Sequence, residues 1–116
     1  TKLDAFAAVG IETLHLPNSE GKVDLEALLI ELGQRQMNDV MLECGSHLLG
    51  AFLQLALVDE LFLYMAPTLL GSDARGLATL PFSQMAEQLR LDINDMCKVG
   101  DDIRLHCRPR YAGQEV

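Results

Sequence analysis

Residues Glu43-Cys44-Gly45-Ser46-His47-Leu48-Leu49-Gly50 join two apolar segments of this 116-residue chain. The segment before them, Asp39–Leu42, is typical of a buried strand, and the one after them, 48–57, has helical spacing. A glycine at such a junction lets a ligand approach the main chain, because no Cβ is in the way. The first N–H groups of a helix have no partner within it and favour an anion. The stretch therefore predicts either a phosphate cradle or a plain helix cap, and its spacing alone does not separate the two.

Composition excludes several classes of protein. About half of the residues are apolar (49%), so one domain, or part of one, can bury a core. The net charge of -8 argues against nucleic-acid binding, which needs a basic face. No apolar stretch is long enough to span a membrane. Cys44, Cys97 and Cys107 lack CxxC spacing, so we expect buried, reduced thiols, a cytoplasmic location and no metal site.

The first half of the chain alternates helical and strand patterns. Residues 1–10 indicate a short helix closed by Gly10, and residues 11–16 alternate as in a short strand. A helix is expected to begin at Asp24, with leucines at helical spacing behind it. Residues 40–42 form the next predicted strand, and Ser46 is the expected cap of the helix that follows.

The second half begins with Leu61–Ala66, a run that is apolar on both faces, as in a central strand covered by helices on each side. Residues 68–84 are irregular and too long for a simple turn, which is typical of a functional loop. Residues 89–108 alternate around a turn at Gly100 and predict an antiparallel hairpin with one wet face. The order β-α-β-α-β followed by a hairpin predicts an α/β fold with a mostly parallel sheet flanked by helices.

Candidate chemistry begins with Glu43, at the carboxyl end of a predicted inner strand, where ligands bind in open α/β sheets. Its carboxylate could hold a sugar hydroxyl or a ring N–H, or it could be a solvated turn residue. His47 is a candidate for proton transfer or simply an exposed residue at a helix start. Asp59 and Glu60 are adjacent on a strand and point to opposite faces, so they form no catalytic dyad. His106, like His15, is expected to be a structural or surface residue, and no catalytic residue is assigned.

Three motifs together resemble a known family. They are Glu43–Leu53, with its Glu-x-Gly and Gly-x-Phe elements, then Leu57–Leu61, with Val-Asp-Glu, then Ala66–Gly71, with Pro-x-Leu-Leu-Gly. With Gly71–Gly76 they are similar to the C-terminal reductase domain of the bifunctional riboflavin-biosynthesis deaminase/reductase. The resemblance extends from about Leu3 to the hairpin and implies a dihydrofolate-reductase-like fold.

The resemblance also implies an activity: NADPH-dependent reduction of 5-amino-6-(5-phosphoribosylamino)uracil to the ribityl compound in riboflavin biosynthesis. It places Glu43 in contact with the phosphoribosyl pyrimidine substrate. It assigns the cofactor NADPH to a continuous set of residues: Gly45, Ser46, His47, Leu48, Leu49, Gly50 and Ala51. Two alternatives remain open, another dihydrofolate-reductase-like NADPH reductase and a non-enzymatic α/β interaction module.

By the same resemblance, residues 1–116 correspond to the C-terminal part of a pyrimidine reductase domain. The N-terminal part of that domain and the zinc deaminase domain are absent from this sequence. We therefore expect the 116 residues alone to be inactive. Exposed sheet edges pair readily with other chains, so we also expect a homo-oligomer formed through sheet edges.

Overall fold

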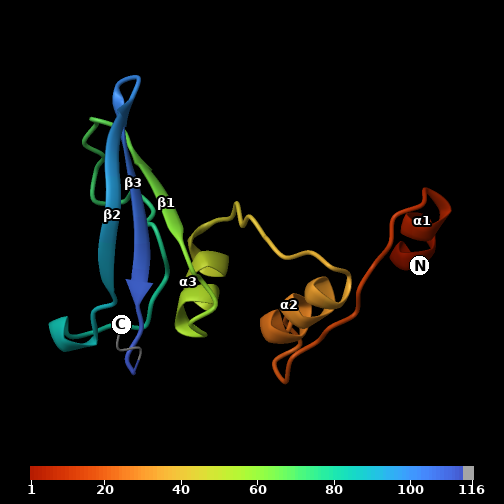
Figure 1. Cartoon of the computed structure of the whole chain (residues 1–116). Coiled ribbons are helices and arrows are strands. Elements are labelled where there is room, and N and C mark those ends of the chain that lie inside the picture. The colour runs from red at the N-terminus through yellow and green to blue at the C-terminus, as the bar shows by residue number, and fades with distance from the viewer. Residues whose placement is uncertain (114–116) are drawn as a thin grey trace. The chain divides into compact units, whose positions relative to one another are not determined.

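The computed structural model describes residues 1–113 and divides the chain into two compact units (Figure 1). The first unit, Thr1–Met41, contains the helices α1 (Lys2–Ala8) and α2 (Leu25–Gln34). The second unit begins at Leu42. Its elements are α3 (Ser46–Gln54), β1 (Leu61–Met65), the 3-10 helix η1 (Met85–Glu87), β2 (Arg90–Val99) and β3 (Asp102–Arg110).

Both helices of the first unit begin where their sequence predicts, and α1 also ends as predicted. Thr1 and Asp4 form a capping box at the start of α1, and Gly10 follows the helix with a φ of +76°. The carboxylate of Asp24 accepts the N–H of Ala27 at 2.9 Å and caps α2. Arg35, just after α2, donates to Glu12 at 2.6 Å and lowers the pKa of that carboxyl.

The two short strands predicted in the first half do not form. Residues 11–16 and 39–45 are extended or irregular, and the nearest pairing is an isolated bridge between Pro17 and Val23. A strand exists only when its N–H and C=O groups have a neighbouring strand. Among residues 1–113 neither segment has one, and Met41 leaves 82% of its side chain exposed.

The sheet has the order β1-β3-β2, and both of its strand pairs are antiparallel. The α/β composition is confirmed, but a mostly parallel sheet is not found in the described residues. The sequence of β1 predicted a covered central strand, yet β1 is at the sheet edge, with Phe62 and Tyr64 more than half exposed. Its outer edge carries unpaired main-chain groups in the described chain.

The C-terminal hairpin is confirmed. Val99 pairs with Asp102 across a two-residue turn that has Gly100 at its first position, with a φ of +61°. This is the position at which a type II′ turn requires glycine. Cys107 is fully buried on the inner face of β3, while Arg108 and Arg110 are exposed on the opposite face. The predicted alternation between a packed and a wet face is therefore correct.

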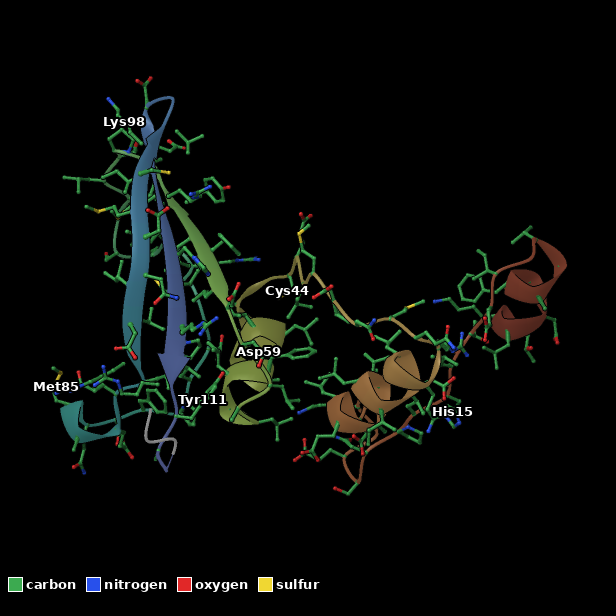
Figure 2. All side chains as sticks on the ribbon, in the orientation of Figure 1. His15, Cys44, Asp59, Met85, Lys98 and Tyr111 are labelled. Carbon is green, nitrogen blue, oxygen red and sulfur yellow. The ribbon has the colours of Figure 1, made fainter. Side chains whose placement is uncertain are left out.

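The core of the second unit is small. Phe52 and Leu53 of α3 and Cys107 and Pro109 of β3 are buried there. The hydroxyl of Tyr111, labelled in Figure 2, donates to the carbonyl of Val58 at 3.0 Å and so joins the end of β3 to the loop before β1. Many large apolar side chains remain exposed, including Leu69 and Met85. Exposed apolar surface on this scale is typical of an interaction surface.

Candidate functional site

The site is built around the start of α3. Gly45 is the N-cap residue, with φ −81° and ψ 172°, and no side chain caps the helix. The predicted cap, Ser46, is instead the first helical residue, because Gly45 already takes the extended conformation of a cap. The first intrahelical bond runs from the N–H of Leu49 to the carbonyl of Gly45, at 3.1 Å.

This geometry leaves the first main-chain N–H groups of α3 without hydrogen-bond acceptors in the described chain. The N–H groups of Ser46, His47 and Leu48 precede the first helical hydrogen bond and have no acceptor among residues 1–113. They lie at the positive end of the helix dipole, which favours negative charge. Gly45 is exposed and Ser46 is half-buried, so solvent and ligands reach these donors.

A hollow of about 520 Å³ lies beside these donors. One wall is the segment Cys44–Leu48, and the other is Arg75–Leu77 from the long irregular loop. Arg75 therefore lines the same hollow as the helix start, and it was not among the predicted site residues. The long loop was predicted to be functional, but only the fold shows which of its residues reach α3.

The predicted cofactor residues divide into two groups. Gly45, Ser46, His47 and Leu48 line the hollow, whereas Leu49, Gly50 and Ala51 lie further along α3 and do not. Glu43 is exposed and directly precedes the lining segment, although it does not line the hollow itself. The structure thus brings the first four residues together with Arg75. Glu43 is next to the lining segment in sequence but is not part of the lining.

Two glycines of this region differ in what surrounds them. A Cβ added to Gly45 would meet no protein atom within 4 Å, and its φ suits any residue. Packing within the described chain therefore does not require glycine there. A Cβ on Gly50 would lie 2.9 Å from the carbonyl carbon of Thr79 and closer still to its oxygen. Glycine at position 50 is needed for the close approach of the long loop.

A second and larger hollow, of about 740 Å³, lies at the other end of the sheet. Its walls are residues 65–69, which begin with the last residue of β1, and residues near the hairpin turn, including Met96 and Ile103. Lys98, labelled in Figure 2, belongs to the same end of the sheet. The lining is mainly apolar, which suits a packing surface better than a site for a charged ligand.

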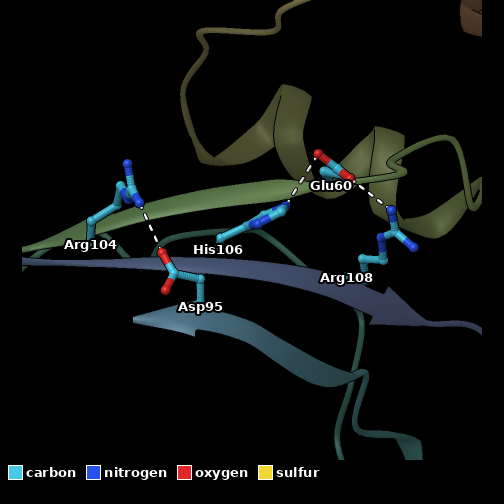
Figure 3. A network of polar contacts seen from close by, with 5 residues as sticks. All are labelled: Glu60, Asp95, Arg104, His106 and Arg108. Carbon is cyan, nitrogen blue, oxygen red and sulfur yellow. Dashed lines mark hydrogen bonds and ion pairs between the residues drawn. The ribbon is translucent and has the colours of Figure 1, made fainter. Parts of the chain in front are cut away.

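Charged side chains on the outer sheet face pair with one another (Figure 3). Arg108 donates to Glu60 at 2.9 Å, and the second Glu60 oxygen is 3.2 Å from Nε2 of His106. The hydrogen bond from Arg108, with a smaller contribution from His106, lowers the pKa of Glu60. The ring of His106 also stacks on Phe62, with centroids 4.5 Å apart. Glu60 and His106 therefore have structural partners, which for His106 agrees with one of its two sequence-based interpretations.

Two other kinds of site are absent from residues 1–113. No three side chains of His, Cys, Asp or Glu are grouped so that they could hold a metal ion. None of the helices there has the length and apolar character needed to cross a membrane. All three cysteines are free thiols, but the prediction that they are buried is correct only for Cys107, since Cys97 is half-buried and Cys44 is exposed.

The family model for the RibD C-terminal domain matches residues 1–105. The riboflavin biosynthesis protein RibD of Escherichia coli K12 is 45% identical over 97 residues, which are 83% of this chain and 26% of that protein. A 5-amino-6-(5-phosphoribosylamino)uracil reductase of Buchnera aphidicola is 38% identical over 90 residues, covering 77% of this chain and 44% of the relative.

Solved structures agree with the sequence matches. The structure of Acinetobacter baumannii RibD, form 2, has a TM-score of 0.83 and 39% identity, over 92% of this chain and 29% of that chain. The matched part of this chain spans about a quarter of the length of the Escherichia coli protein and less than half of the length of the Buchnera relative.

Proposed function

This chain belongs to the RibD C-terminal domain family, and from that premise we propose that it forms part of an NADPH-dependent reductase of riboflavin biosynthesis. The proposed reaction converts 5-amino-6-(5-phosphoribosylamino)uracil to its ribityl form. The name of the Buchnera relative supports this substrate. Because the chain spans only part of its relatives, the activity is proposed for the protein that contains these residues.

The observation that carries the proposal is the uncapped start of α3 beside Arg75. Free N–H groups at a helix start, together with a nearby guanidinium, fit the negative charge of a dinucleotide's pyrophosphate. Gly45 adds a second feature, since a Cβ there would occupy the space beside these donors and nothing in the chain's own packing requires its absence. A nicotinamide dinucleotide therefore suits the residues present.

In this proposal the N–H groups of Ser46, His47 and Leu48 bind phosphate oxygens, and Arg75 neutralises charge from the opposite wall. Leu49 and Ala51 contribute as part of the helix that carries these donors, and Gly50 contributes through its loop contact. When bound, the cofactor would supply a hydride to C1 of the sugar. The bond from C1 to the ring oxygen would break, and that oxygen would take up a proton. The chain's own task is to orient donor and acceptor.

We assign Glu43 to the pyrimidine substrate. Glu43 directly precedes the segment that lines the hollow, and it is exposed. Its carboxylate takes part in none of the ion pairs found in residues 1–113. A carboxylate can accept hydrogen bonds from ring N–H groups or from sugar hydroxyls. Placed beside the cofactor hollow, it would hold the substrate near the dinucleotide without itself contacting the phosphates.

We further propose that residues 1–116 form the C-terminal part of a dihydrofolate-reductase-like reductase domain. The extended segments at 11–16 and 40–42 and the exposed edge of β1 have unpaired main-chain groups that other strands of such a domain would satisfy. A mostly parallel sheet would then arise from strands outside this sequence. Sheet edges left exposed would favour a homo-oligomer.

The test uses the native protein that contains these residues. NADPH oxidation that depends on the phosphoribosyl pyrimidine is the expected activity, followed by the loss of NADPH absorbance. Glu43→Gln removes the charge and should raise the KM for the pyrimidine about 10- to 100-fold, the range for a lost charged hydrogen bond. Affinity for NADPH should remain unchanged.

The matched control is Glu26→Gln, which removes an exposed carboxylate from α2 in the other unit. Both kinetic constants of this control should equal those of the unchanged protein. If the unchanged protein binds NADPH but never oxidises it with this pyrimidine, the proposed substrate is wrong.

A further inference from the structure

Among residues 1–113, every hydrogen bond between the long loop 68–84 and α3 involves the same loop residue, Thr79. The N–H of Thr79 donates to the carbonyl of Ser46 at 2.9 Å, and its hydroxyl lies 3.4 Å from that of Ser46. The carbonyl of Thr79 receives a long hydrogen bond of 3.5 Å from the amide of Gln54. Thr79 thus contacts α3 through both of its main-chain polar groups.

The contact points on α3 follow one line along the helix. Ser46, Gly50 and Gln54 are spaced four residues apart, so they share one face. Gly50 is the middle one, and it is buried beneath the carbonyl of Thr79. Any side chain at position 50 would push Thr79 away and break the hydrogen bonds on either side of it.

The same loop forms one wall of the candidate site. Arg75–Leu77 line the hollow and come only two to four residues before Thr79. Chain connectivity therefore couples the position of this wall to the position of Thr79. A shift of Thr79 away from α3 would carry Arg75 away from the free N–H groups at the helix start.

We propose that Gly50 and Thr79 are positioning residues, whose contact holds the Arg75 wall against the start of α3 and so sets the affinity for the dinucleotide. This inference rests on the proposed function, and it changes the role of Gly50. Position 50 acts through the loop, because its own surroundings are filled by Thr79.

The test compares Gly50→Ala with Gly33→Ala in the native protein that contains these residues. Both glycines are helical, and alanine is the better helix former, so neither change weakens its own helix. A Cβ at Gly33 meets no atom within 4 Å, which makes it the matched control. For Gly50→Ala we expect the KM for NADPH to rise about tenfold or more, with kcat within about twofold, since one charge-assisted contact is lost. Gly33→Ala should leave both constants unchanged.

A second variant and a second measurement separate positioning from general damage. Thr79→Pro removes the main-chain donor to Ser46 and should raise the KM for NADPH in the same way. Amide exchange should show the Thr79 N–H protected in the unchanged protein and fast in Gly50→Ala. Helix content, measured by circular dichroism, should be the same in the unchanged protein and in Gly50→Ala.

The outcomes distinguish the two proposals. Normal NADPH binding in the unchanged protein with an unaltered KM in Gly50→Ala would overturn the positioning role alone. Fast exchange of the Thr79 amide in the unchanged protein would do the same. Absence of NADPH binding in the unchanged protein would overturn the proposed function, and the positioning role with it.

Discussion

Replacing Gly45 by alanine tests whether ligand binding, rather than folding, requires glycine at the start of α3. The added methyl group would meet no protein atom within 4 Å, and the φ of −81° is ordinary for alanine. The expected structural cost is only the poorer N-cap preference of alanine, roughly 0.5–1 kcal/mol. That cost should lower the melting temperature by a few degrees at most.

The cost to the dinucleotide should be larger. The methyl group would stand beside the free N–H groups of Ser46, His47 and Leu48, where we place the phosphates. A hydrogen bond to a charged group contributes about 1.5–3 kcal/mol, so the loss of one such bond weakens binding roughly 10- to 100-fold. The loss in affinity should therefore exceed the loss in stability, which is the signature of a residue that serves the ligand.

The assay is a titration of the native protein with NADPH, followed by nucleotide fluorescence. Gly71→Ala is the control, because it adds the same methyl group to an open position in the same unit. Its Kd should match that of the unchanged protein. An unaltered Kd in Gly45→Ala, with the protein folded, would refute the placement of phosphate at this helix start.

Three further predictions concern stability and assembly. Tyr111→Phe removes two hydrogen bonds to the main chain and should cost about 1–2 kcal/mol in urea unfolding, whereas Tyr64→Phe, at an exposed position, should cost nothing measurable. Because Arg108 holds the pKa of Glu60 below its ordinary 4.5, this pair stabilises the fold above pH 4.5 and the stabilisation is lost as pH falls below it. Glu60→Gln should reduce the dependence of the melting temperature on pH in that range. The isolated 116-residue chain should self-associate and show no substrate-dependent NADPH oxidation; sedimentation as a clean monomer at high concentration, or measurable turnover, would contradict this.

The elements that the sequence predicts correctly are those whose causes are local. The hairpin needs only alternation and a glycine at the turn, and Gly100 provides it. The start of α2 needs only the carboxylate of Asp24 within three residues of a free N–H. By contrast, residues 40–42 have a strand-like pattern but no strand, because a strand depends on a neighbour that the described chain does not supply.

The candidate site shows the same division. Gly45 and Ser46 could be found from sequence, since a strand-like run, a glycine and a helix start are adjacent along the chain. Arg75 and Thr79 could not, because they reach α3 only through the path of a loop about 30 residues later. One signal was present, the Arg75-Gly76 pair within a long loop, but nothing in the loop's composition shows that it returns to α3.

The sequence pattern of β1 and its exposure in the structure disagree, and this difference identifies a surface that lacks a partner in the described residues. Every residue of β1 is apolar or aromatic, which is the composition of a strand covered on both faces and paired at both edges. In residues 1–113 one edge of β1 is paired with β3 and the other is open, and Phe62 and Tyr64 are exposed. Exposing such a strand is unfavourable, since both apolar area and main-chain groups face water. The composition of β1 therefore fits a strand with more packing and pairing neighbours than these residues supply. This agrees with relatives that are several times longer.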